Sequence, residues 1–160
     1  MLFRSVTICA ETPGFLTSKD GFSLNATQDF TAIGQADIVV VPYWQHVPER
    51  PPQTLLDSLV QARDRGAEIV GLCLGSFVLA WAGILDGKRA ATHWEFERQF
   101  QSLFPNVRLD INALYVDDGN IITSAGTAAA LDCCLYIIRQ RFGSVVANQI
   151  ARRMIVPPHR

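Results

Sequence analysis

The sequence predicts one α/β domain in which a mostly parallel sheet lies between two layers of helices, a flavodoxin-like three-layer sandwich. Apolar, β-branched runs alternate with helical patterns along the chain, and this alternation is typical of parallel α/β sheets. The length of 160 residues fits a single domain over 1–160, and the 49% of hydrophobic residues can form a substantial core. We expect no DNA-binding domain in this chain.

The individual elements follow from the spacing of apolar residues. The run at 38–41 is typical of a strand buried on both faces, and 53–65 has an apolar stripe at helical spacing that ends at Gly66. By the same reasoning, the expected strands are 3–10, 22–24, 38–41, 67–72, 107–109, 113–116 and 120–123. The expected helices are 53–65, 75–84, 94–104, 127–141 and, after Gly143, 144–155.

Composition argues against several classes of protein. The formal net charge is −1, without the basic excess typical of nucleic-acid binders. No segment has the pattern of a signal peptide or the apolar length of a membrane span. We therefore expect a cytoplasmic protein whose four cysteines are free thiols and which does not bind membranes. The three histidines are scattered and no cysteine pair has metal-ligand spacing, so we expect no metal site and no cofactor.

Cys73 lies where a buried strand ends and an apolar helix begins with almost no linker. A residue at such a turn is forced into a sparsely populated backbone conformation, as in the nucleophile elbow of hydrolases. A thiol at a helix N-terminus is favoured as the thiolate, and the N–H groups that follow it can bind an anion. The alternative interpretation is that Cys73 is simply a small buried apolar residue.

The motifs around Cys73 resemble those of the ThiJ/PfpI, or class I glutamine amidotransferase-like, families. A Gly-x-Cys-x-Gly-Ser elbow is followed by a Gly-x-Leu-x-Gly turn, a Thr-His-Trp segment and a second strand–turn–helix. These motifs are Gly71 to Ser76, Gly83 to Gly87, Thr92 to Trp94, and Val116 to Gly126 followed by Asp132. The match extends from about Ile38 to the C-terminus and implies the fold described above.

One subgroup matches the end of the chain as well. The segment from Arg152-Arg153 to Val156-Pro157-Pro158-His159-Arg160 resembles the end of the sensor domain in AraC-type transcriptional regulators. That resemblance implies a homodimerising domain that senses a small-molecule ligand and contacts DNA through a separate domain.

Two features depart from the family pattern. Family members begin with a strand and a helix ahead of the segment that matches Phe3, and that part carries an acidic residue facing the cysteine. We expect both elements to be missing here, which leaves apolar surface exposed. Pro42 is followed by Tyr43 and Trp44 where the family often has glycine, so an oxyanion hole from that loop is not expected.

The resemblance implies a site around Cys73 in which His93 is the second candidate catalytic residue. His93 has the alternative role of a helix cap, and Ser124 that of a turn residue. The expected ligand pocket is lined by Tyr43, Trp44, Leu74, Gly75, Trp94, Ser124, Ala125 and Gly126.

Three functions fit these residues. The first is the sensor domain, the second a cysteine-dependent amidase- or hydratase-like enzyme, and the third a redox-responsive protein in which Cys73 oxidises. Nucleophilic catalysis needs a base and a group that orients it, and no orienting carboxylate is evident in the sequence. The sensor domain is therefore preferred.

Overall fold

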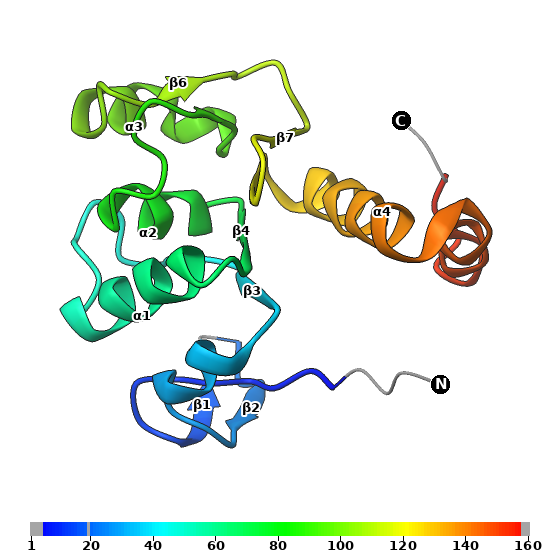
Figure 1. Cartoon of the computed structure of the whole chain (residues 1–160), viewed down its shortest axis with the longest axis horizontal. Coiled ribbons are helices and arrows are strands. Elements are labelled where there is room, and N and C mark those ends of the chain that lie inside the picture. The colour runs from blue at the N-terminus through cyan, green and yellow to red at the C-terminus, as the bar shows by residue number, and fades with distance from the viewer. Residues whose placement is uncertain (1–4, 19, 158–160) are drawn as a thin grey trace.

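The computed structural model describes residues 5–18 and 20–157, and its central feature is a mixed sheet (Figure 1). The strand order is β3-β4-β8-β7. These strands are β3 (Ile38–Val41), β4 (Glu68–Leu72), β8 (Ile121–Ser124) and β7 (Tyr115–Asp117). Strands β3, β4 and β8 are parallel, and β7 pairs with β8 in the antiparallel sense.

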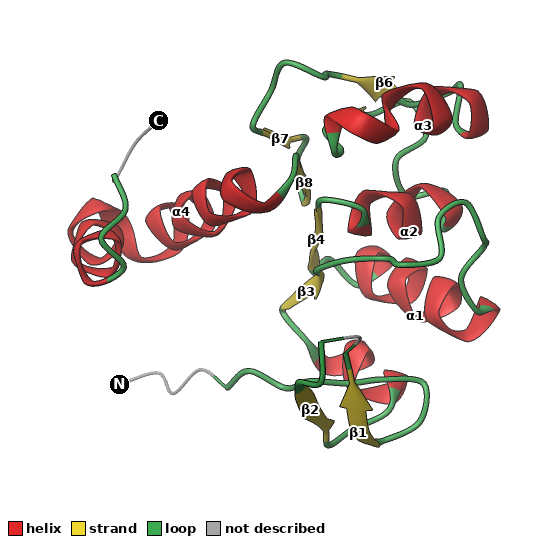
Figure 2. Ribbon diagram, turned by 180° about the vertical axis from the view of Figure 1, so that it is seen from behind, coloured by secondary structure: helices red, strands yellow, loops and turns green. Residues whose placement is uncertain are grey.

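Helices cover the two faces of this sheet. Helices α1 (Gln53–Asp64) and α2 (Gly75–Trp81) lie on one side, and α4 (Thr127–Arg153) lies on the other (Figures 1 and 2). The predicted three-layer α/β class is therefore confirmed.

Smaller elements surround the central sheet. A hairpin joins β1 (Gly14–Thr17) to β2 (Ser23–Ala26), and the 3-10 helix η1 (Phe30–Gln35) leads into β3. Beyond α2, β5 (Arg89–Ala90) pairs in parallel with β6 (Arg108–Leu109). The 3-10 helix η2 (Trp94–Phe96) and α3 (Glu97–Leu103) lie between these two strands in the sequence.

The larger core lies between the sheet and the helices α1 and α2. On β4 the side chain of Ile69 is completely buried, and on α2 every residue from Gly75 to Ala80 is buried. Phe77 packs edge-on against Phe100 with ring centroids 4.9 Å apart. Burying one such side chain stabilises the fold by roughly 1.5–3 kcal/mol, so this layer fixes the position of the turn that precedes α2.

The opposite face carries a smaller core. Val70 and Ile122 from the sheet pack against Cys133 of α4. Tyr136 on the same helix donates a hydrogen bond of 2.6 Å to Asp117 at the end of β7. Helix α4 is thus attached to the sheet through both apolar and polar contacts.

Helix α4 changes direction at Gly143. This residue has φ 84° and ψ 166°, which is outside the helical region. The sequence places a break at this glycine, and the structure confirms it.

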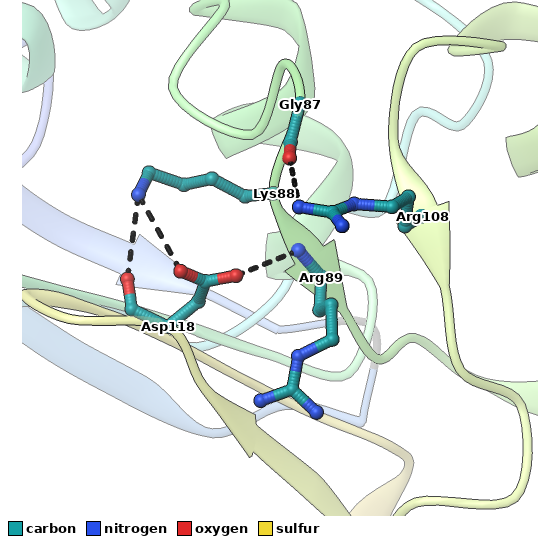
Figure 3. A network of polar contacts seen from close by, with 5 residues as sticks. All are labelled: Gly87, Lys88, Arg89, Arg108 and Asp118. Carbon is teal, nitrogen blue, oxygen red and sulfur yellow. Dashed lines mark hydrogen bonds and ion pairs between the residues drawn. The ribbon is translucent and has the colours of Figure 1, made fainter.

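A polar network attaches the β7–β8 turn to β5 (Figure 3). The backbone N–H of Arg89 donates a 2.9 Å hydrogen bond to the Asp118 carboxylate, and Lys88 Nζ lies 3.7 Å from the other carboxylate oxygen. Nearby, the Arg108 guanidinium donates to the Gly87 carbonyl at 2.6 Å. The Arg89 N–H is the main reason that the pKa of Asp118 lies below its usual range.

The predicted strand at 3–10 is wrong over its described part. Residues 5–8 have no strand assignment, and Cys9 forms an isolated bridge with Gln28. Val6 is 96% exposed. The sequence pattern is that of a strand, but among the described residues no neighbouring strand supplies a ladder for it. Phe3 lies outside the described residues, as do Pro158, His159 and Arg160 of the C-terminal motif.

Other segments also differ from expectation in extent. The helix predicted at 75–84 ends at Trp81, and the strands predicted at 22–24 and 113–116 are Ser23–Ala26 and Tyr115–Asp117. The helix predicted at 94–104 begins as the 3-10 turn η2 and becomes α-helical at Glu97. The strand predicted at 107–109 is reduced to β6, which pairs with β5 instead of joining the central sheet. Within the described part of the chain, no helix has both the length and the apolar character needed to cross a bilayer.

Candidate functional site

Three loops meet at the carboxyl ends of the parallel strands. Val41 is in register with Gly71, and Leu72 is in register with Ser124. The segments that follow β3, β4 and β8 therefore leave the sheet at the same edge, where sites form in such folds. The backbone N–H of Cys73 donates to the Ser124 carbonyl at 3.1 Å and ties two of these loops together.

Cys73 has the positive φ that its position predicts. Its φ is 52°, in the left-handed region that non-glycine residues rarely adopt. The chain turns so tightly here that Gly75 lies against β3, and a Cβ atom on Gly75 would overlap with the Val41 carbonyl oxygen. Glycine at this position is therefore a packing requirement of the turn.

The Cys73 thiol is half-buried between two helix N-termini. Its sulfur accepts hydrogen bonds from the backbone N–H groups of Leu74, before α2, and of Thr127, the first residue of α4. These donors act to lower the thiol pKa, but burial outweighs them and the pKa of Cys73 is raised. The N–H groups favour the thiolate, as the sequence predicts, but the cost of desolvating the charged sulfur is larger.

Two buried hydroxyl groups lie beneath Cys73. Ser76 Oγ lies 2.8 Å from the Cys73 carbonyl oxygen and 2.7 Å from Thr92 Oγ1. Both side chains are fully buried. Sequence reasoning did not assign a role to them, although a serine within the apolar α2 segment is a signal that a buried partner exists.

His93 caps η2 and also lies against the start of α4. Its Nδ1 accepts a 3.3 Å hydrogen bond from the Glu95 N–H, and its ring stacks on Trp94 at 5.8 Å. A Cβ atom on Gly126 would overlap with Cδ2 of His93 and lie 3.0 Å from Nε2. The histidine therefore adjoins Gly126, while the Cys73 sulfur contacts the next residue, Thr127.

The remaining predicted pocket residues differ in exposure. Tyr43 is 56% exposed and Trp94 is 70% exposed, so both present aromatic surface to solvent. The indole Nε1 of Trp44 donates to the Glu49 carbonyl at 2.9 Å, which directs this side chain toward its own loop.

Other predicted pocket residues are turn residues or core. Ser124 is fully buried and its hydroxyl donates to the Ala125 carbonyl at 3.0 Å, as a turn residue would. Leu74 is buried in the larger core. Leu74 and Ser124 therefore present little side-chain surface to a ligand.

Two hollows on the surface lie away from Cys73. One, of about 460 Å³, is lined by Asp37, Arg65, Gly66, Ala67 and Arg141. The other, of about 490 Å³, lies between the segment around Asp29 and the exposed side of α1. Neither hollow includes a predicted pocket residue. Across residues 5–18 and 20–157, no group of three or more His, Cys, Asp or Glu side chains is arranged to hold a metal ion.

The fold and the site define a class of protein: an α/β sandwich with a cysteine at a strained strand-to-helix turn, close to the N-terminus of a second helix. The profile of the DJ-1/PfpI family matches residues 3–140. The chain belongs to the DJ-1/PfpI family.

Regulators and an enzyme are found among the relatives. The chain is 31% identical over 143 residues to the HTH-type transcriptional regulator CdhR of Pseudomonas aeruginosa, covering 89% of this chain and 42% of the regulator. It is 29% identical over 145 residues to the isonitrile hydratase of Pseudomonas putida, covering 89% of this chain and 62% of the enzyme. The chain thus spans less than two thirds of either protein.

Solved structures share the fold. An AraC family transcriptional regulator from Pseudomonas putida superposes with a TM-score of 0.81 at 23% identity, covering 92% of this chain and 80% of that one. Drosophila melanogaster DJ-1beta superposes with a TM-score of 0.78 at 21% identity, covering 91% and 78%. The structures show the fold, and the 31% identity to CdhR confirms the homology to AraC-type regulators inferred from the sequence.

Proposed function

We propose that this chain is the ligand-sensing, dimerising domain of an AraC-type transcriptional regulator, acting in the cytoplasm and contacting DNA through a separate domain. The observation that carries the proposal is the 31% identity to the regulator CdhR across 89% of this chain. The free thiols of the described cysteines are consistent with a reducing compartment.

The geometry at the carboxyl ends of the strands supports ligand binding there. The backbone N–H groups of Leu74 and Thr127 converge on Cys73 and donate to its sulfur, so the polar end of a ligand would meet the thiol at this edge of the sheet. Tyr43 and Trp94 add exposed aromatic surface. A small molecule with one polar end and an apolar or cationic body fits these two features.

The side chains available for acid–base catalysis near Cys73 support a sensing function more than an enzymatic one. A cysteine nucleophile needs a base that a third group orients. The Nδ1 atom of His93 is engaged by the Glu95 backbone N–H instead of by a carboxylate. The raised pKa of Cys73 also lowers the fraction of thiolate at neutral pH.

Thermal unfolding in the presence of a panel of amino acids, amines and carboxylates tests the sensing function. A ligand present at about 100 times its Kd stabilises the fold by about 2.7 kcal/mol, so we expect at least one compound to raise the Tm. The variants Tyr43→Ala and Trp94→Ala should weaken this effect. Phe15→Ala is the matched control, because Phe15 is 78% exposed on the β1–β2 hairpin.

The alternative is an isonitrile hydratase, and the similarity to the Pseudomonas putida enzyme favours it. That reaction adds one water to the isonitrile carbon and yields the N-substituted formamide. Incubation with a simple isonitrile, followed by NMR, would detect the formamide. Turnover that disappears in Cys73→Ala would replace the sensor proposal with an enzymatic one.

A further inference from the structure

Two hydroxyl groups are fully buried in the layer beneath the Cys73 turn. Ser76 is 0% exposed in the first turn of α2, and Thr92 is 1% exposed ahead of η2. Buried hydroxyl groups destabilise a fold unless they are hydrogen-bonded. Their partners here are each other and the carbonyl oxygen of Cys73.

The hydroxyl protons can be arranged in two ways, and both supply the Cys73 carbonyl. Ser76 can donate to that carbonyl at 2.8 Å while Thr92 also donates to it at 3.4 Å. Alternatively, Ser76 donates to Thr92 at 2.7 Å and Thr92 donates to the carbonyl at 3.4 Å. In either arrangement the carbonyl receives a hydroxyl hydrogen bond.

The carbonyl of Cys73 and the N–H of Leu74 belong to the same planar peptide group. Because the peptide is planar, fixing the direction of its oxygen also fixes the direction of its N–H on the opposite side. That N–H donates to the Cys73 sulfur. The two buried hydroxyls are therefore coupled to the thiol through one rigid group.

We propose that Ser76 and Thr92 are positioning residues for Cys73, which hold the Cys73–Leu74 peptide so that the Leu74 N–H faces the sulfur. Both hydroxyls act on the carbonyl oxygen of this peptide. The role also explains how a non-glycine residue keeps φ 52° at this turn. The proposal rests on the proposed function only in placing Cys73 at the functional site.

The test is the pH profile of Cys73 alkylation by iodoacetamide, followed by peptide mass mapping. Thr92→Val keeps the shape of threonine but removes the hydroxyl, and Ser76→Ala does the same for serine. Losing the Leu74 donor should move the profile to higher pH in Ser76→Ala, which removes the shorter bond to the carbonyl, and most of all in the double variant Ser76→Ala/Thr92→Val, which removes both. A thiol pKa that is higher by about one pH unit lowers the thiolate fraction, and hence the alkylation rate at a fixed lower pH, about tenfold. Thr92→Ser should restore the wild-type profile.

Thr123→Val is the matched control. Thr123 is 1% exposed, and its hydroxyl accepts a 2.8 Å hydrogen bond from the Ala91 N–H. This variant should lose stability without moving the alkylation profile. His93 and Tyr43 are titratable side chains at the same edge of the sheet, so the profiles are also recorded in His93→Gln and Tyr43→Phe backgrounds.

A wild-type profile in the double variant Ser76→Ala/Thr92→Val, or an equal change in Thr123→Val, would overturn the positioning role. If the hydroxyl variants do not fold, NMR of the wild-type protein decides. The amide proton of Leu74 should then follow the titration of Cys73, and an amide that does not respond contradicts the contact. None of these measurements uses a ligand, so a failed ligand screen would count against the sensor function and leave this result unchanged.

Discussion

At the scale of single residues, the turn at Cys73 depends on the absence of a side chain two positions later. Gly75 lies against the backbone of β3, and the atom it would meet is a carbonyl oxygen, which cannot move without disturbing the β3–β4 ladder. The strained cysteine and the close approach of Gly75 are thus two parts of the same local geometry.

Gly75→Ala should therefore destabilise the protein strongly. Overpacking a core costs typically 1–3 kcal/mol, and we expect about 3 kcal/mol or more because the obstacle is backbone. Urea unfolding followed by circular dichroism measures this. Gly34→Ala is the control, since a Cβ there meets open space and the backbone has ordinary φ. Equal effects of the two substitutions would refute the packing argument.

The cysteines should differ in their rates of alkylation. Cys133 is fully buried, and burial is the main cause that raises its pKa to about 12. It should react last. Cys73 should react first because two backbone N–H groups support its thiolate, even though burial raises its pKa.

Limited iodoacetamide treatment and peptide mass mapping measure this order. Cys73→Ser should remove the fast phase without unfolding the protein. Cys134 is the cysteine that could be alkylated before Cys73, since it is exposed. Faster modification of Cys134 than of Cys73 would weaken both the catalytic and the redox interpretations of Cys73.

At the scale of elements, the contact between α4 and β7 is sensitive to alkaline pH. The neutral phenol of Tyr136 donates to the Asp117 carboxylate at 2.6 Å, and this hydrogen bond is the main cause that raises the pKa of Tyr136 to about 12. A phenolate cannot donate this bond and is repelled by the carboxylate.

The stabilisation from Tyr136 should be lost as pH rises. A group whose pKa is raised by folding contributes fully below its unfolded pKa, 10.0 here, and the contribution disappears as pH rises through about 12. The free energy of unfolding of the wild-type protein should therefore fall between these values relative to Tyr136→Phe. Parallel curves for the two proteins over this range would contradict the role of the hydrogen bond.

The sequence predicts an element well where the apolar pattern of the segment agrees with the neighbours that the segment contacts in the fold. Strands β3, β4 and β8 and the helix α1 lie where their apolar runs place them, because a buried parallel strand has few alternative structures. The break in α4 follows from a single glycine. The segment at 5–8 has a strand pattern but no ladder, since pairing is a property of two segments and cannot be seen in one.

The candidate site was predictable to a similar degree. The positive φ of Cys73 follows from a turn between a buried strand and a buried helix. The roles of Ser76 and Thr92 could not be predicted, because their partners depend on a contact between segments 16 residues apart. The raised pKa of Cys73 was also not predictable, because it depends on the degree of burial.

At the scale of the whole molecule, β3 lies at one edge of the central sheet, and among the described residues no strand pairs with its outer side. The Glu68 N–H donates to the Asp37 carbonyl. From this residue onward, every second residue of the strand directs its backbone N–H and C=O groups toward β4. The backbone N–H and C=O groups of Ile38 and Val40 consequently point away from β4. The side chain of Val40 is 48% exposed. Unpaired, uncharged strand edges pair readily with other chains.

Further apolar side chains are exposed on the second half of α4. Val145 on this helix is 72% exposed, and Met154, just beyond the last helical residue Arg153, is 47% exposed. These two regions are the alternatives for an interface between copies of the chain. A charged side chain in the true interface should disrupt it, because burying an unpaired charge is costly.

The isolated chain should therefore form a dimer at micromolar concentration, as measured by light scattering. We expect Val40→Lys to shift the protein toward monomer, since lysine on an edge strand opposes pairing. Val145→Lys is the matched control with the same change of charge on the other exposed region. Dissociation by Val145→Lys alone would place the interface on α4 instead. A wild-type protein that is monomeric at these concentrations would contradict dimerisation by the isolated domain.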